Sequence, residues 1–116
     1  MHMQDSFNIP KIELHAHIGG CMRGATFMEL VMAKEIDLDK VDFYKVDIAT
    51  AFEFFKIVGQ LVTDIPTLQR IVYEIIEDFS KQNTKYLELR STPKDFRNSN
   101  AKDYINAIIE VIESAE

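Results

Sequence analysis

Cysteine is scarce in this sequence: Cys21 is the only one among 116 residues. A single thiol cannot form a disulfide within the chain, so a disulfide-stabilised framework is excluded and a reducing, cytoplasmic compartment is expected. Runs of about 18 apolar residues are also missing, and we therefore expect no transmembrane span. Residues 1–10, MHMQDSFNIP, have neither a basic start nor an apolar stretch, so we predict a loose polar lead and no signal peptide.

Positive charge is outnumbered by negative charge. Lys and Arg number 13 against 19 Asp and Glu, which gives a formal net charge of −6. This balance argues against a nucleic-acid polymer or an anionic membrane surface as a partner, but it is compatible with a small anionic ligand held by a few local donors. The sequence has no internal repeat. Its hydrophobic fraction of 47% predicts a buried core, and its length fits one small domain.

Two short stretches have the pattern of β-strands. Apolar and polar residues alternate strictly over Ile12–Ile18, with His15 and His17 on the polar face. Gly19–Gly20 then ends the strand and begins a loop. A second strand is predicted at residues 85–90, KYLELR, where two leucines face one way and charged or polar side chains face the other.

Four helices are predicted from capping signals and apolar periodicity. Two begin with T-x-x-E capping boxes, one has a proline in its first turn, and one has cap residues before an apolar face. We expect the apolar stripes to pack in the core rather than to bind a cofactor. A charged, irregular loop is expected at residues 37–47. The capping signals are Thr26 with Glu29, Thr50 with Glu53, Pro66, and Asn100 with Asp103; the stripes include Phe52, Phe55, Leu68, Ile71, Val72 and Ile75.

The predicted order of elements is strand, helices, strand, helix. Strands separated by helices favour parallel pairing and an α/β architecture. Two strands cannot close a barrel, and an open pair leaves its sheet edges unpaired. A closed barrel of this class typically needs about 250 residues. We therefore predict that residues 1–116 form the N-terminal portion of a single TIM-type (β/α)8 barrel domain, with a helical insert after the first strand.

In such a barrel the polar faces of both strands would point into the interior. The side chains of Glu13, His15, His17, Glu88 and Arg90 would then line the lumen. Barrel enzymes carry their chemistry at the carboxyl ends of the strands, which is where these residues cluster. The alternative is an ordinary half-exposed sheet, which shows the same alternation.

The pair formed by His15 and His17 is the sharpest candidate for chemistry. Residues two apart on a strand project to the same side, roughly 6.6 Å apart along the chain. Two neutral imidazoles can then converge on one metal ion, and zinc suits them. The alternative is two ordinary histidines at the surface of an edge strand. Because a catalytic zinc usually takes three protein ligands, and because the remaining His2 lies in the lead, further ligands would come from carboxylates or from chain outside this sequence.

Cysteine chemistry gives no support to a different metal site. Cys21 stands alone, so the P-C-x-x-C signature of zinc cytidine deaminases is absent. A lone cysteine usually behaves as a small hydrophobic side chain, and we assign Cys21 no functional role.

The stretch RSTP at the end of the second strand is a candidate anion site. Arg90, Ser91 and Thr92 bring a guanidinium, two hydroxyls and backbone N–H groups to one place. The alternative is that Arg90 pairs with Glu88 or Glu13 and that the Ser-Thr pair only forms a turn.

Taken together, these motifs resemble the adenosine deaminase family. PKIELHAHIGG, from Pro10, is similar to the first barrel strand of the family, and KYLELRSTP resembles the second strand of a branch that acts on N6-methyl-AMP and related nucleotides. The resemblance implies hydrolytic deamination of a small purine nucleoside or nucleotide, in which zinc activates the water that attacks C6 of the ring. It implies that His15 and His17 bind Zn²⁺ and that the substrate is contacted by His17, Gly19, Arg90, Ser91, Thr92 and Pro93.

The chain departs from the family pattern at two glycines and in length. Gly19 stands where the family has Asp or Asn, and Gly59 aligns with a histidine of the nucleotide branch. Family members run to about three times this length, the usual size of an elaborated barrel. The resemblance implies that the third histidine ligand, the aspartate ligand and the catalytic glutamate lie beyond residue 116. No catalytic residue is therefore expected within this chain.

Three hypotheses for function result. The leading one is part of a zinc-dependent purine deaminase. The second is another metal-dependent amidohydrolase of the same barrel superfamily, although the long helical insert between the strands favours the deaminase. The third is a non-catalytic small α/β module or a truncated product. The sequence indicates no oligomeric state. An open part of a barrel exposes apolar helix faces, so we expect aggregation or loose packing when residues 1–116 are made alone.

Overall fold

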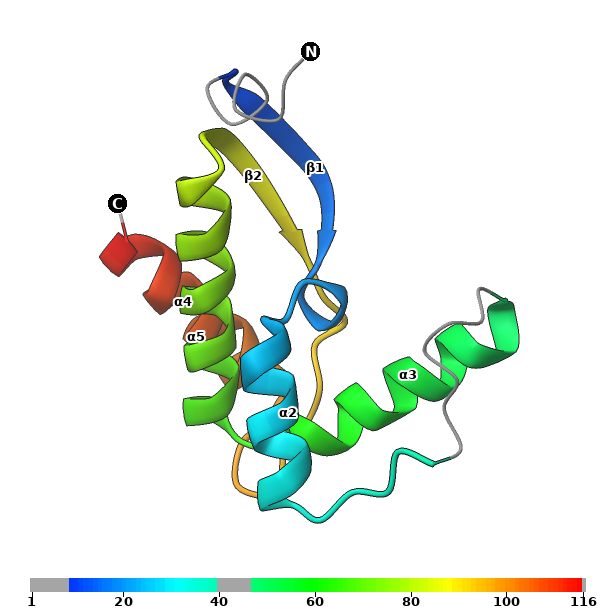
Figure 1. Cartoon of the computed structure of the whole chain (residues 1–116). Helices are drawn as coiled ribbons and strands as arrows, with labels where there is room; N and C mark the ends of the chain where they lie inside the picture. Colours follow the sequence, from blue (N-terminus) through cyan, green and yellow to red (C-terminus); the bar gives the residue numbers. More distant parts are fainter. Residues whose placement is uncertain (1–8, 40–46, 116) are drawn as a thin grey trace.

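The computed structural model describes residues 9–39 and 47–115. In chain order the elements are β1 (Lys11–His17), the short 3-10 helix η1 (Ile18–Gly20), α2 (Gly24–Ala33), α3 (Ile48–Leu61), α4 (Ile65–Lys81), β2 (Thr84–Arg90) and α5 (Ala101–Ala115), drawn in Figure 1. Both predicted strands and the predicted helices are therefore confirmed. The predicted loose lead falls mostly on residues 1–8, and much of the predicted loop falls on residues 40–46, both outside the described residues.

The two strands pair in parallel, as the order of strands and helices predicted. The register places Lys11 opposite Thr84 and His17 opposite Arg90. Because both strands run in the same direction, their carboxyl ends meet at one edge of the sheet, next to η1 (Figure 1). The residues that follow the two strands are therefore neighbours in space although they are distant in sequence.

The core lies where α4 packs against β2 and α5. The apolar stripe predicted for α4 is buried: Leu68 and Val72 are 0% exposed, and Ile71 and Ile75 are 1% exposed. Leu61, at the end of α3, is also 0% exposed and joins the same cluster. Full burial of one such side chain contributes about 1.5–3 kcal/mol. This cluster therefore anchors the end of α3 and the buried face of α5 against α4.

Both predicted capping boxes are wrong. Helix α2 begins at Gly24, before Thr26, and no side chain caps it. Thr26 is instead 2% exposed and its hydroxyl donates to Glu74 Oε1 on α4 at 2.5 Å. Helix α3 begins earlier than Thr50, because Asp47 accepts a hydrogen bond from the Thr50 N–H at 2.7 Å.

The other helix starts agree with the sequence. Pro66 lies in the first turn of α4, where a missing N–H costs nothing, and Asp64 caps that helix by accepting from the Thr67 N–H at 2.8 Å. At α5 the predicted cap is reciprocal. The Asp103 N–H donates to Asn100 Oδ1 at 2.9 Å, and the Asn100 N–H donates to Asp103 Oδ2 at 3.0 Å.

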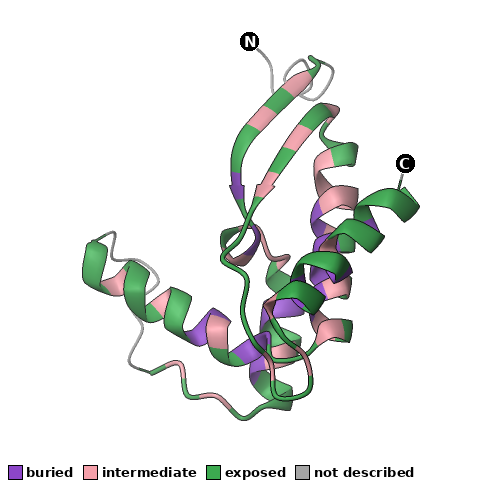
Figure 2. Cartoon of the chain, turned by 180° about the vertical axis from the view of Figure 1, so that it is seen from behind, coloured by how far each residue is buried: buried purple, intermediate pink, exposed green. Residues whose placement is uncertain are grey.

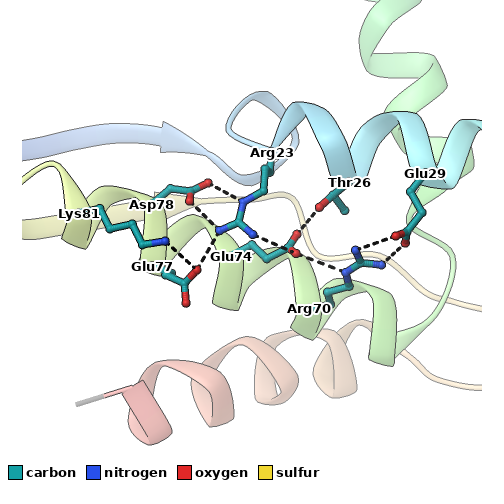
Figure 3. Close-up of polar contacts among 8 residues, drawn as sticks. All are labelled: Arg23, Thr26, Glu29, Arg70, Glu74, Glu77, Asp78 and Lys81. Atoms are coloured by element: carbon teal, nitrogen blue, oxygen red, sulfur yellow. Dashed lines mark hydrogen bonds and ion pairs between the residues drawn. The ribbon is translucent and has the colours of Figure 1, made fainter.

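A network of charges joins α2 to α4 (Figure 3). Arg23 Nη2 lies 2.7 Å from Asp78 Oδ1 and 3.1 Å from Glu77 Oε1. Further along, Arg70 pairs with both Glu29 of α2 and Glu74 of its own helix. The side chain of Arg23 is 32% exposed and those of Glu77 and Asp78 are 36% exposed, so solvent screens these contacts. We call the contacts of Arg23 with Glu77 and Asp78 the α2–α4 clamp.

Many apolar side chains that the sequence placed in the core are exposed (Figure 2). Phe52 is 70% exposed and Phe55 is 49% exposed, because the N-terminal part of α3 extends away from the other elements. On β1, Ile12 is 69% exposed and Leu14 is 52% exposed. The apolar faces expected in an open part of a barrel are therefore present. Among the described residues, no helix combines the length and the apolar character needed to cross a bilayer.

Candidate functional site

The two histidines of β1 point at one another. His15 and His17 project from the same face at the carboxyl end of the strand, and their Nε2 atoms lie 2.8 Å apart. The rings meet edge to face, with centroids 4.6 Å apart and planes at 75°. Both side chains are exposed, so the pair is open to solvent and to ligands.

This geometry meets the requirement for two ligands of one ion. Each neutral imidazole has one nitrogen that can donate a lone pair, and zinc–nitrogen bonds are about 2.0–2.1 Å long. Two nitrogens separated by 2.8 Å can both reach a single ion at that bond length. In the absence of an ion, the same separation is that of a hydrogen bond in which one ring donates and the other accepts.

Carboxylates do not complete this pair. The carboxylate of Glu13 accepts a hydrogen bond from the backbone N–H of His15 at 3.2 Å. The pKa of the Cys21 thiol is raised, chiefly by burial and to a lesser degree by the negative charge of Glu13. Within residues 9–39 and 47–115, no three side chains of the His, Cys, Asp and Glu types are gathered closely enough to hold a metal ion. His2 lies outside the described residues.

Arg90 ends β2 beside the histidines. It is opposite His17 in the register, and its Nε donates to the Leu14 carbonyl at 3.1 Å. Neither carboxylate considered as its partner pairs with it in the described structure, since Glu88 accepts from the Tyr86 hydroxyl at 2.9 Å and Glu13 bonds to backbone. The hydrogen bond to Leu14 ties the guanidinium to β1 and leaves nitrogens free for a ligand.

A cavity of about 180 Å³ opens where the two strands end. The predicted substrate residues His17, Gly19, Arg90, Ser91 and Thr92 all line it. Pro93 does not, and instead borders a neighbouring apolar cavity of about 360 Å³ between β2, α4 and α5. Five positions from two distant motifs thus share one cavity, because parallel pairing brings the strand ends together.

The cavity also contains residues that the sequence reasoning missed. Lys94, Tyr104 and Phe55 line it. Lys94 directly follows RSTP, and that adjacency was a signal that could have identified it. Tyr104 and Phe55 were expected only as apolar core residues, and their contact with the cavity depends on the packing of α5 and α3.

The two glycines that depart from the family pattern face this region. A Cβ atom at Gly59 would lie 3.6 Å from Lys94 Nζ, so the absence of a side chain leaves room for the ammonium group beside α3. A Cβ atom at Gly19 would lie 3.2 Å from Val58 Cγ1, which is a tight contact. Gly19 therefore allows η1 to approach α3 closely.

Comparison with known proteins agrees with both motifs. The profile that describes adenosine deaminase matches residues 10–116. The chain belongs to the adenosine deaminase family. The match includes both strands, η1 and all the described helices.

Individual members of the family are similar over nearly the whole chain. N6-mAMP deaminase of Arabidopsis thaliana is 36% identical over 117 residues, covering 92% of this chain and 33% of that protein. Adenosine deaminase of Clostridium perfringens is 31% identical over 122 residues, covering 94% of this chain and 37% of that protein. The chain thus spans about a third of the length of the curated relatives it matches.

A solved structure of the family has the same arrangement of elements. The crystal structure of Arabidopsis ADAL complexed with GMP matches with a TM-score of 0.84 at 33% identity, covering 98% of this chain and 37% of that one. Together with the parallel β1–β2 pair and its helical connection, this likeness confirms the predicted fold class, the N-terminal portion of a TIM-type barrel.

Proposed function

We propose that the protein is a zinc-dependent hydrolase that deaminates a purine nucleoside or nucleotide. The observation that carries this proposal is the approach of His15 Nε2 and His17 Nε2 to 2.8 Å at the carboxyl end of β1. The deaminase names of the Arabidopsis and Clostridium relatives support the same reaction class. Because the chain spans about a third of their length, the proposal does not assign the whole catalytic apparatus to these residues.

In this proposal His15 and His17 hold zinc through neutral ring nitrogens. When bound, zinc lowers the pKa of a coordinated water toward neutrality and so supplies a nucleophile at physiological pH. The remaining ligands and the general acid and base belong to chain that this sequence does not contain. No catalytic residue is proposed within residues 1–116.

The substrate residues of the proposal are His17, Gly19 and the segment Arg90–Pro93. Two observations favour a nucleotide over a nucleoside. Arg90 and Lys94 line the cavity, and no Asp or Glu is among the described residues that do so, although the chain as a whole has a net charge of −6. A related structure, that of Arabidopsis ADAL, is complexed with GMP. A cytoplasmic location and the lack of a nucleic-acid partner stay predictions from composition.

Metal analysis of histidine variants tests the metal site, in the full-length protein that the proposal takes to include the rest of the barrel. We expect His15→Ala and His17→Ala each to lose the zinc that the unmodified protein retains. Removing a ligand should lower the deamination rate by more than about 100-fold, since outer-shell partners alone typically contribute 10–100-fold. Zinc is measured by elemental analysis, and activity by the absorbance change of adenosine and N6-methyl-AMP.

The third histidine of the sequence provides the control. His2→Ala removes the same side chain from the predicted lead and should keep both zinc and activity. Full zinc content in both β1 variants would refute the proposed ligands. A protein that binds no divalent ion would favour the non-catalytic module, and one that hydrolyses a cyclic amide but no purine would favour the other amidohydrolase.

A further inference from the structure

Tyr104 is a buried tyrosine whose hydroxyl reaches the candidate substrate segment. The residue lies in the first turn of α5 and is 4% exposed. Its ring packs against Phe96, with centroids 5.5 Å apart. Its phenolic oxygen lies 2.5 Å from Ser91 Oγ, and both residues line the cavity at the strand ends. A buried tyrosine hydroxyl needs a partner, and here that partner follows β2 directly.

The direction of this hydrogen bond matters for any ligand. Each hydroxyl has one proton to donate and lone pairs to accept with. If Ser91 donated to Tyr104, its only proton would be used, and its oxygen would present lone pairs to the cavity. If Tyr104 donates, the proton of Ser91 remains available to a ligand that accepts hydrogen bonds.

The charges around the cavity select between these two arrangements. Arg90 and Lys94 both line it, so a bound group is expected to be anionic. An anion repels lone pairs and accepts protons, which favours donation from Tyr104 to Ser91 and from Ser91 to the anion. Hydrogen bonds arranged in series polarise one another, so the tyrosine strengthens the bond made by the serine.

We propose that Tyr104 is a positioning residue: its O–H donates to Ser91 Oγ and thereby aims the Ser91 proton at a phosphate monoester held by Arg90 and Lys94. Tyr104 does not itself contact the phosphate. The inference rests on the proposed function for the identity of the purine but not for the geometry of the two hydroxyls. It assigns to α5 a role in recognising the nucleotide class of substrate.

The test measures binding of AMP and of adenosine to the purified protein by titration calorimetry. Tyr104→Phe keeps the ring and its packing but removes the hydroxyl. We expect its Kd for AMP to rise roughly two- to tenfold, the equivalent of one hydrogen bond, while its Kd for adenosine stays unchanged. Ser91→Ala should show the same selective loss. The double variant should bind AMP no more weakly than Ser91→Ala alone, because the two hydroxyls act in series.

Tyr86→Phe is the matched control. This substitution also removes a phenolic hydrogen bond, the one from Tyr86 to Glu88 at 2.9 Å. Because Tyr86 does not line the cavity, AMP binding should be unaffected. Equal weakening of AMP and adenosine in Tyr104→Phe would indicate a merely structural role and overturn the inference, as would additive losses in the double variant. The deamination assay is separate and uses the full-length protein, which the proposed function takes to include the rest of the barrel. Selective AMP binding without deamination by that protein would refute the proposed function and keep this inference, whereas deamination with normal AMP binding by Tyr104→Phe would refute this inference alone.

Discussion

At the scale of single residues, the candidate site depends on which side chains share a face. Strict alternation places His15 and His17 together on β1, and the parallel register then places Arg90 opposite His17. The two motifs are distant in sequence, and the expected barrel placed both of their polar faces in one lumen. Pairing of the strands brings His17 and Arg90 to the lining of one cavity.

Lys94 provides the prediction at this scale. Its ammonium group lies beside Gly59 and lines the cavity, where it would neutralise a phosphate. We expect Lys94→Met to lower kcat/KM for N6-methyl-AMP by roughly tenfold, since a hydrogen bond to a charged group is lost, and to leave kcat/KM for adenosine unchanged. Steady-state kinetics with both substrates checks this. Lys85→Met, an exposed lysine of β2 that does not line the cavity, is the control, and an equal loss with both substrates would contradict a phosphate contact.

At the scale of elements, local side-chain caps begin several helices, and charged contacts join one helix to another. The α2–α4 clamp holds the helix after β1 against the helix before β2 (Figure 3). Thr26 illustrates the competition involved. Its hydroxyl has the sequence context of an N-cap, yet α2 begins before it at Gly24, and the hydroxyl donates to a carboxylate of α4 instead.

The clamp predicts a pH dependence of stability. The Arg23 guanidinium holds the pKa of Asp78 below its usual value. A carboxyl whose pKa is lower when folded stabilises the protein above its unfolded pKa, near 4, and loses this effect as the pH falls through the lower folded pKa. Because the side chain of Asp78 is 36% exposed, we expect a contribution of about 1 kcal/mol or less.

Urea unfolding at neutral pH and in steps below about pH 4 measures this contribution. The free energy of unfolding of Asp78→Asn should be lower than that of the unmodified protein at neutral pH, and the difference should shrink at acid pH. Glu113→Gln changes an exposed carboxyl of α5 and serves as the control. A difference that stays constant across the range would rule out the ionised clamp as its source.

At the scale of the whole molecule, the described residues form an open structure. One sheet edge on each side is unpaired, and large apolar side chains remain exposed, including Ile12 at 69% and Phe52 at 70%. The cavity of about 360 Å³ between β2, α4 and α5 is also lined mainly by apolar side chains. Exposed apolar surfaces and unpaired strand edges favour self-association unless more protein covers them.

This openness predicts the behaviour of residues 1–116 in isolation. We expect the purified chain to bind a hydrophobic dye and to form larger species as its concentration rises, because burial of the exposed apolar faces is favourable. Sedimentation velocity over a range of concentrations measures the association. A monomer with a sharp, cooperative thermal transition and no dye binding would contradict this expectation.

The sequence by itself determined the elements, the strand faces and the family, because alternation, helical periodicity and two contiguous motifs are local patterns. It was right about Pro66 and the Asn100–Asp103 cap, where the contacts lie within one turn. Only the tertiary structure decided that Thr26 bonds to α4, that Phe52 and Phe55 are exposed, and that Tyr104 reaches the cavity. These outcomes depend on how helices pack across long sequence separations, and no local pattern records which distant side chain will be the neighbour.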